Sequence, residues 1–165
     1  MKIVMVRVDE RLIHGQITMR WSKTVASNMI LCVNDSVAAN ELQKKLMRMA
    51  APPGIKVEIE DIKTASEKLA SNAWPEANIL LLVRNPIDIL KLVKAGLQIS
   101  KINIGGVRTP GATIKLNKVV LATPEELAAW KELDELGIVL EVQFLPGEGI
   151  AVLNDVVKKM NWVRM

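Results

Sequence analysis

The sequence contains few cysteine, histidine and aromatic residues. Its 165 residues include one cysteine, one histidine, one phenylalanine and no tyrosine. A lone cysteine cannot close an internal disulfide, and one cysteine with one histidine cannot supply the four ligands of a typical structural zinc site. No G-x-G-x-x-G follows the first apolar run, and the string GVRTPGAT lacks the lysine of a nucleotide-binding P-loop. We therefore expect neither a metal site nor a cofactor.

Long hydrophobic runs are also missing. The most apolar stretch, NILLLV at residues 78–83, is far shorter than the roughly 20 residues that a membrane helix needs. Arg7 and Asp9 interrupt the first apolar run, which therefore lacks the continuous core of a signal peptide. The sequence predicts a cytoplasmic protein.

The charge of the chain is only mildly positive. It has 22 basic and 18 acidic residues, no run of lysine and arginine exceeds two, and no aromatic residues are interleaved with them. A single-stranded nucleic acid would need such aromatic side chains for stacking. We therefore expect no nucleic-acid partner, and the charge favours an anionic partner such as a phosphorylated protein.

Short apolar runs alternate with helical patterns along the chain. Several runs are continuously apolar, which is typical of parallel strands covered on both faces. The pattern predicts an α/β fold in a single domain, residues 1–165, with a mostly parallel central sheet of six to seven strands and helices on both faces. The segment 102–121 has no helix between its runs and is a candidate antiparallel edge. The predicted strands are 3–8, 29–33, 57–60, 79–83, 102–104, 119–121 and 139–144.

Capping residues predict where helices begin. The three starts expected are a capping box of Thr64 with Glu67, Asn85 before Pro86, and Thr123 with Glu126. Another helix is expected from about Val37 to just before Pro52, with an apolar stripe of Leu42, Leu46 and Met49. The tryptophans at 21, 74, 130 and 162 are expected to pack in or around the core rather than to form a sugar platform.

The single histidine, His14, follows the first predicted strand. In parallel sheets, ligands bind at the carboxyl ends of the strands, and a helix start offers unpaired backbone N–H groups to anions. Arg11 adds a planar cation suited to phosphate oxygens, and Asp9 could orient the imidazole or hold Arg11. An ordinary loop histidine is the alternative. Imidazole is nucleophilic at neutral pH, so this loop is a candidate phosphoryl-carrying site.

The segment RVDERLIHGQITMRW closely resembles the active-site segment of the IIB components of bacterial sugar phosphotransferase systems of the mannose–fructose–sorbose family. The similarity extends over most of the chain, through ANELQKKLMRMAAPPGIKVEI, LLVRNPIDILKLVKAGLQISKINIGG and ELDELGIVLEVQFLP.

This resemblance implies a phosphotransferase with a phosphohistidine intermediate. Such a protein accepts a phosphoryl group from its IIA partner on His14, through Nδ1, and donates it to a sugar imported by the IIC and IID membrane components. Arg11 would stabilise the transferred group, with Asp9, Gly15 and Gln16 in supporting roles. The resemblance also implies association in pairs and a cytoplasmic location at the inner face of the membrane through partner subunits. Basic residues such as Arg7, Arg11 and Arg20 would face an acidic partner.

The segment VRTPGATIKLN departs from the Arg-Gln-Gly-Lys type of loop expected in this family. Arg108 is the candidate for the missing basic contact, and the alternative is a plain hairpin turn on Pro110 and Gly111. A second function also stays open, a non-catalytic module in which the strand-end loops hold an anionic small molecule or a regulator. The sequence does not identify the sugar.

Overall fold

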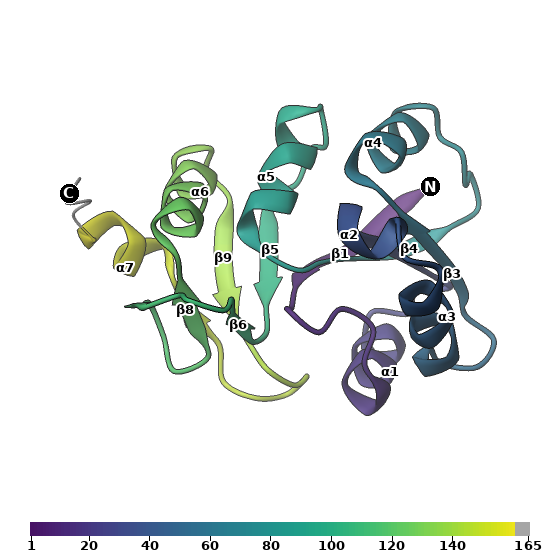
Figure 1. Ribbon diagram of the computed structural model, residues 1–165, viewed down its shortest axis with the longest axis horizontal. Helices are drawn as coiled ribbons and strands as arrows, with labels where there is room; N and C mark the ends of the chain where they lie inside the picture. The colour runs from purple at the N-terminus through teal and green to yellow at the C-terminus, as the bar shows by residue number, and fades with distance from the viewer. Residues whose placement is uncertain (161–165) are drawn as a thin grey trace.

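The central sheet confirms the α/β fold class (Figure 1). The computed structural model describes residues 1–160. Seven strands lie in the order β10-β9-β5-β1-β4-β2-β3, and every neighbouring pair is parallel except β9 with β10. These strands are β1 (Lys2–Val8), β2 (Met29–Val33), β3 (Lys56–Glu60), β4 (Asn78–Val83), β5 (Lys101–Ile104), β9 (Val139–Val142) and β10 (Ala151–Val152).

Helices cover both faces of this sheet. Strand β2 shows the division, because Ile30 and Cys32 pack with one helix layer while Leu31 and Val33 pack with the other. The first layer has α1 (Gly15–Thr24), α2 (Asp35–Ala38) and α3 (Glu41–Ala50). The second has α4 (Ile62–Ala70), α5 (Pro86–Lys94), α6 (Pro124–Glu135) and α7 (Asn154–Lys159). Burial raises the pKa of Cys32 to about 12, so this thiol stays protonated in the core.

The expectation for segment 102–121 is wrong in one respect. Its later part forms a separate sheet in the order β6-β8-β7, from β6 (Val107–Arg108), β7 (Ile114–Lys115) and β8 (Val120–Ala122). The antiparallel edge of the central sheet is instead β10, which the sequence did not predict. The segment after β5 pairs with itself instead, β6 with β8 in parallel and β7 with β8 antiparallel.

The helix predicted from Val37 is in fact two helices, α2 and α3. Asn40 starts the second by accepting a hydrogen bond from the Gln43 N–H. The stripe of Leu42, Leu46 and Met49 is exposed, at 65%, 54% and 73%. The contacts to the sheet are made by Met47 and Ala50, which lie on a different side of the helix.

Two of the three predicted helix starts are confirmed. Asn85 caps α5, and Thr123 with Glu126 forms the capping box of α6. The Thr64 box is wrong, because Asp61 caps α4 by accepting a hydrogen bond from the Thr64 N–H at 2.7 Å. The carboxylate directly after β3 thus starts the helix earlier than predicted.

The tryptophans within the described residues are packing residues, as predicted. Trp21, Trp74 and Trp130 are buried, and Trp162 lies outside the described part of the chain. None of the helices in residues 1–160 has the length and apolar character needed to cross a membrane.

Candidate functional site

The loop between β1 and α1 lies at the carboxyl edge of the central sheet. Its backbone is tied to the neighbouring segments, since the Asp9 N–H donates to the Val83 carbonyl and the Glu10 N–H donates to the Gly106 carbonyl, both at 2.9 Å. Leu12 has a left-handed backbone, with φ of 57°, and its side chain is fully buried. The loop is therefore held by the strands on either side of β1.

His14 is the N-cap residue of α1, and its backbone is extended. Its N–H donates to Thr18 Oγ1 at 2.8 Å, and its side chain is 17% exposed. Nδ1 lies 2.8 Å from the Leu12 carbonyl oxygen, and Nε2 lies 3.7 Å from Asp9 Oδ2. Each ring nitrogen thus faces an oxygen that accepts hydrogen bonds.

Both carboxylate oxygens of Asp9 accept hydrogen bonds. Its side chain is 1% exposed. Oδ1 accepts a hydrogen bond from the Arg11 N–H at 3.1 Å, while Oδ2 accepts one from Arg7 Nη2 at 3.2 Å. The Arg11 backbone N–H and the His14 ring therefore both lie next to the Asp9 carboxylate.

Arg7 does not face a partner, in contrast to the prediction. Its guanidinium is 2% exposed and lies over the Trp21 ring, 4.9 Å from the ring centre. Desolvation on burial lowers its pKa, but an arginine remains protonated at neutral pH. The charge is paired with Asp9, and the other N–H groups donate to the Asn103 side chain and to carbonyl oxygens after β9. Arg7 is a buried structural cation.

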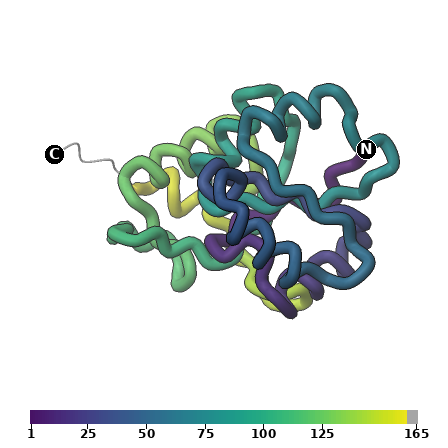
Figure 2. The backbone as a smooth tube through the Cα atoms, turned by 45° about the vertical axis from the view of Figure 1, so that its right-hand side comes forward, coloured from purple at the N-terminus to yellow at the C-terminus, as the bar shows by residue number. Residues whose placement is uncertain are grey.

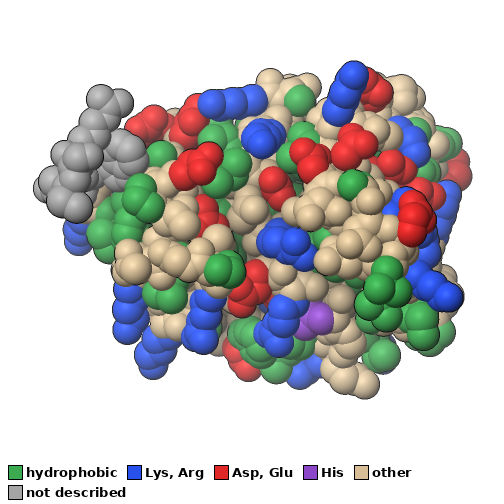
Figure 3. Space-filling view, viewed as in Figure 1, with side chains coloured by type: hydrophobic (Ala, Val, Ile, Leu, Met, Phe, Trp, Pro, Cys, Tyr) green, Lys and Arg blue, Asp and Glu red, His purple; other side chains and the backbone are tan. Residues whose placement is uncertain are grey.

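Arg11, Gly15 and Gln16 are exposed beside His14. The His14 side chain does not cap α1. The first N–H groups of a helix have no acceptor inside it, so those of Gly15 and Gln16 are available to an anion. The Arg11 Cζ lies 5.8 Å from the centre of the Phe144 ring. In Figure 3 the chain's single histidine, in purple, lies next to blue basic side chains at the surface.

Gly105 permits the close packing beneath this cluster. A Cβ added there would lie 2.5 Å from Arg7 Nη2 and still closer to Asp9 Oδ2. Gly105→Ala should therefore displace the Arg7–Asp9 pair and lower the free energy of unfolding by about 1–3 kcal/mol. Urea denaturation measures this loss.

Gly149→Ala is the matched control for that substitution. No heavy atom lies within 4 Å of the Cβ it would add, so its effect should stay within about 0.5 kcal/mol. Equal stability of the two variants would show that the Arg7–Asp9 pair does not require glycine at 105.

Arg108 reaches the site through its backbone. Its N–H donates to Glu10 Oε2, and its guanidinium donates to the Lys118 carbonyl, both at 2.9 Å. In the same segment the Ala112 N–H donates to the Thr109 carbonyl, which closes a turn over Pro110 and Gly111. The segment after β5 thus contacts the site loop at Glu10. Its turn does not form the predicted hairpin, because β6 and β7 each pair with β8 and not with each other.

Arg84 and Phe144 are neighbours of the site loop that were not predicted from the sequence. Arg84 directly follows β4, and its Nε donates to the Glu10 carbonyl at 3.1 Å. The rule that singled out Asp9, a polar residue just after a strand, applies equally to Arg84. Phe144 was predicted inside the last strand, but β9 ends at Val142. No sequence signal connects Phe144 with Arg11, 133 positions away (144 minus 11).

The fold and the loop define an α/β protein with a histidine at the carboxyl edge of a parallel sheet, at the start of a helix and three residues after an exposed arginine. The model of the family described as "PTS system sorbose subfamily IIB component" matches residues 3–164. The chain belongs to this family, the IIB components of mannose/fructose/sorbose phosphotransferase systems, as predicted.

Curated relatives agree with this assignment. The chain is 36% identical over 148 residues to the sorbose-specific EIIB component of Klebsiella pneumoniae, covering 90% of each chain. It is 33% identical over 162 residues to the fructose-specific EIIB component of Bacillus subtilis, covering 96% of this chain and 99% of the relative. It matches the mannose-specific EIIAB component of Escherichia coli at 31% identity over 161 residues, or 98% of this chain and half of that longer protein.

Solved structures share the fold. The IIBSor domain of the sorbose permease from Klebsiella pneumoniae superposes with a TM-score of 0.90 at 34% identity, covering 99% of this chain and 100% of that domain. The protein is therefore a phosphoryl carrier of sugar transport and a protein-phosphohistidine–sugar phosphotransferase. These findings favour the carrier over the non-catalytic binding module. They also place the protein in a system with IIA, IIC and IID components.

Proposed function

We propose that His14 carries the phosphoryl group and that Arg11 stabilises it. The observation behind this proposal is the position of the imidazole at the N-terminus of α1, with the exposed Arg11 in the same loop. Transfer between two histidines forms one N–P bond as the other breaks, and the electron pair of the broken bond returns to the donor ring. Such a step depends mainly on positioning and on neutralising the phosphoryl charge.

The phosphoryl oxygens would be held by two kinds of donor. The backbone N–H groups of Gly15 and Gln16 lie in the first turn of α1, where the helix dipole favours an anion. Arg11 supplies a planar fork of N–H groups that can bind two oxygens at once. All of these donors come from the loop after β1 and the first turn of α1.

The imidazole has to turn before it can attack through Nδ1. In the resting structure Nδ1 is 2.8 Å from the Leu12 carbonyl, and a nitrogen that donates to a carbonyl has no free lone pair. We propose that the ring leaves Leu12 while Asp9, now 3.7 Å from Nε2, accepts the Nε2–H. That tautomer leaves the lone pair on Nδ1, facing the incoming phosphorus.

The partners follow from the family. We propose that residues 1–165 act as one IIB unit, alone or paired as a homodimer, in the cytoplasm at the inner face of the membrane through IIC and IID. The donor is the IIA phosphohistidine, and Arg108 is a candidate contact with a partner or with the phosphoryl group. The relatives are named for sorbose, fructose, mannose and N-acetylgalactosamine, so the acceptor is proposed to be a hexose or an amino sugar.

Phosphorylation of the purified protein tests this function. Incubation with the upstream phosphocarrier proteins and IIA should raise its mass by about 80 Da, the mass of one phosphoryl group. The added mass should map to the peptide that contains His14 and disappear in acid, as expected of a phosphorylated nitrogen. Attachment to any other residue would refute the assignment of His14.

A further inference from the structure

The segment that follows β9 crosses to the site and lies against α1. After Val142 the chain leaves the sheet, and both backbone views place this yellow-green loop next to the purple N-terminal segment (Figures 1 and 2). The Gln143 N–H still donates to the Ile104 carbonyl at 3.0 Å, so the loop starts from a fixed point on β5.

Two buried donors hold the Phe144 carbonyl oxygen. Arg7 Nη2 and Trp21 Nε1 both donate to it, each at 3.1 Å. Arg7 Nη1 donates to the neighbouring Gln143 carbonyl at 2.9 Å. Because Arg7 and Trp21 are almost fully buried, these bonds are shielded from water and fix the backbone of Phe144 relative to β1 and α1.

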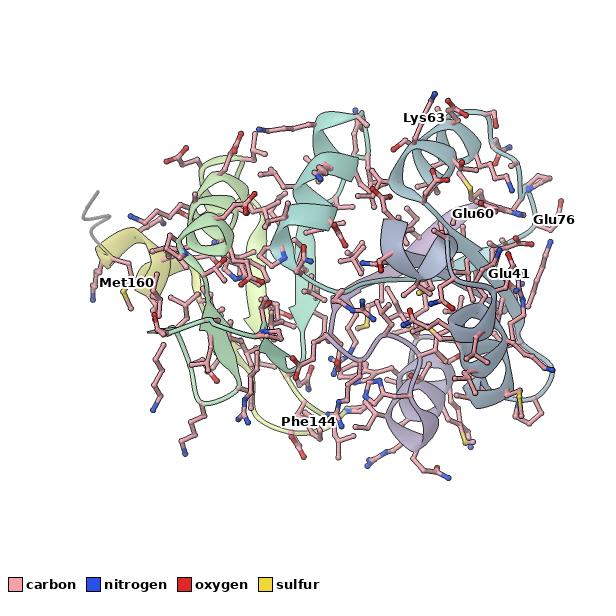
Figure 4. All side chains as sticks on the ribbon, viewed as in Figure 1. Glu41, Glu60, Lys63, Glu76, Phe144 and Met160 are labelled. Carbon is pink, nitrogen blue, oxygen red and sulfur yellow. The ribbon has the colours of Figure 1, made fainter. Side chains whose placement is uncertain are left out.

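The Phe144 side chain is only half-buried, and Figure 4 labels it in the loop that follows β9. The Arg11 Cζ is 5.8 Å from the centre of its ring, within the range of a cation–π contact. In residues 1–160 the Arg11 guanidinium takes part in no ion pair with a carboxylate. The ring is therefore the neighbour that orients this long side chain.

An aromatic neighbour suits an arginine that must bind phosphate. A carboxylate would occupy the N–H groups of the guanidinium and compete with the phosphoryl oxygens. The face of a ring attracts the cation yet uses none of its in-plane N–H groups. A free arginine side chain samples many rotamers, and restricting them beforehand lowers the entropy lost on binding.

We infer that Phe144 is a positioning residue for phosphoryl transfer, which holds Arg11 ready beside His14 and is itself placed by Arg7 and Trp21. The inference rests on the proposed roles of His14 and Arg11. Arg7 then supports both Phe144 and the His14 loop, since the guanidinium that donates to the Phe144 carbonyl is also paired with Asp9.

Single-turnover transfer from phosphorylated IIA tests the inference. Phe144→Leu should lower the maximal transfer rate about two- to fivefold, the range of an exposed cation–π contact, and leave the half-saturating IIA concentration unchanged. Phe144→Tyr, which retains the ring, should restore the rate. Ile150→Ala is the matched control, because Ile150 lies further along the same loop with its side chain exposed.

The decisive comparison repeats Phe144→Leu in an Arg11→Gln background. If Phe144 acts through Arg11, the substitution should have no further effect there. An equal loss in both backgrounds would overturn the inference and indicate a merely structural role. Absence of any label on His14 in the wild-type protein would instead refute the proposed function.

A second measurement does not depend on phosphorylation. NMR relaxation of the Arg11 Nε–H group should report a more mobile side chain in Phe144→Leu than in the wild type or in Phe144→Tyr. Unchanged mobility in Phe144→Leu would overturn the inference even if the transfer rate fell.

Discussion

Replacing His14 with alanine should abolish phosphoryl acceptance. The chain has no second imidazole, so no other side chain can form the same phosphorus–nitrogen bond to a ring nitrogen. Removing Arg11 instead would leave the nucleophile in place and slow the transfer. The measurement is intact mass after incubation with phosphorylated IIA, followed by assay of sugar phosphorylation with the membrane components.

Two controls accompany this prediction. The fold of His14→Ala should be intact by circular dichroism, because the imidazole contributes a single hydrogen bond, to the Leu12 carbonyl, and its Nε2 lies 3.7 Å from Asp9. Leu136→Ala should accept phosphate like the wild type, since Leu136 is exposed and follows the end of α6 that lies away from the carboxyl edge. A His14→Ala protein that still gained the phosphoryl mass would show that another residue is the carrier.

Replacing Arg7 with methionine should lower the free energy of unfolding by about 3–5 kcal/mol. Removing one partner of a buried ion pair leaves the other charge unpaired in a poorly solvated place. The Asp9 side chain, 1% exposed, would be that charge. The carbonyl oxygens of Gln143 and Phe144 would lose donors as well. Urea denaturation monitored by tryptophan fluorescence measures the loss.

A double substitution separates the charge effect from the loss of packing. In an Arg7→Met background, Asp9→Asn should destabilise less than it does in the wild type, because the carboxylate no longer has a buried cation to lose. Arg20→Met is the matched control on an exposed arginine, and it should change stability by less than about 0.5 kcal/mol. A loss for Arg7→Met as small as that for Arg20→Met would contradict the buried pair.

The features that the sequence predicted correctly are local. Continuous apolar runs gave most of the parallel strands, because a strand buried on both faces has no polar side to display. Thr123 and Glu126 form their capping box within one turn of chain. The segment from Asp9 to Gln16 likewise contains its own helix start, cation and imidazole. Contacts of this kind span only a few residues, so the order of residues is enough to define them.

The wrong predictions for the buried face of α3 and for the start of α4 arose where two local sequence patterns fitted a helix equally well. In α3 two apolar stripes run along one helix, and only the position of the sheet decides that Met47 is partly buried while Leu46 is exposed. At the start of α4, Asp61 and Thr64 are both good capping residues, and the end of β3 selected the first. Hydrophobic pattern and capping preference do not indicate which other part of the chain packs against a helix.

By itself the sequence determined that a histidine and an arginine follow the first strand of a parallel sheet, since both the strand and the loop are encoded by adjacent residues. Only the tertiary structure decided that Arg7 is an internal cation, that Gly105 must lack a side chain, and that Phe144 stands against Arg11. The reason is the strand order, which sets β5 beside β1 and β9 beside β5. Residues about 100 or more positions apart along the chain thereby contact Arg7, Asp9 and Arg11 around the β1–α1 loop.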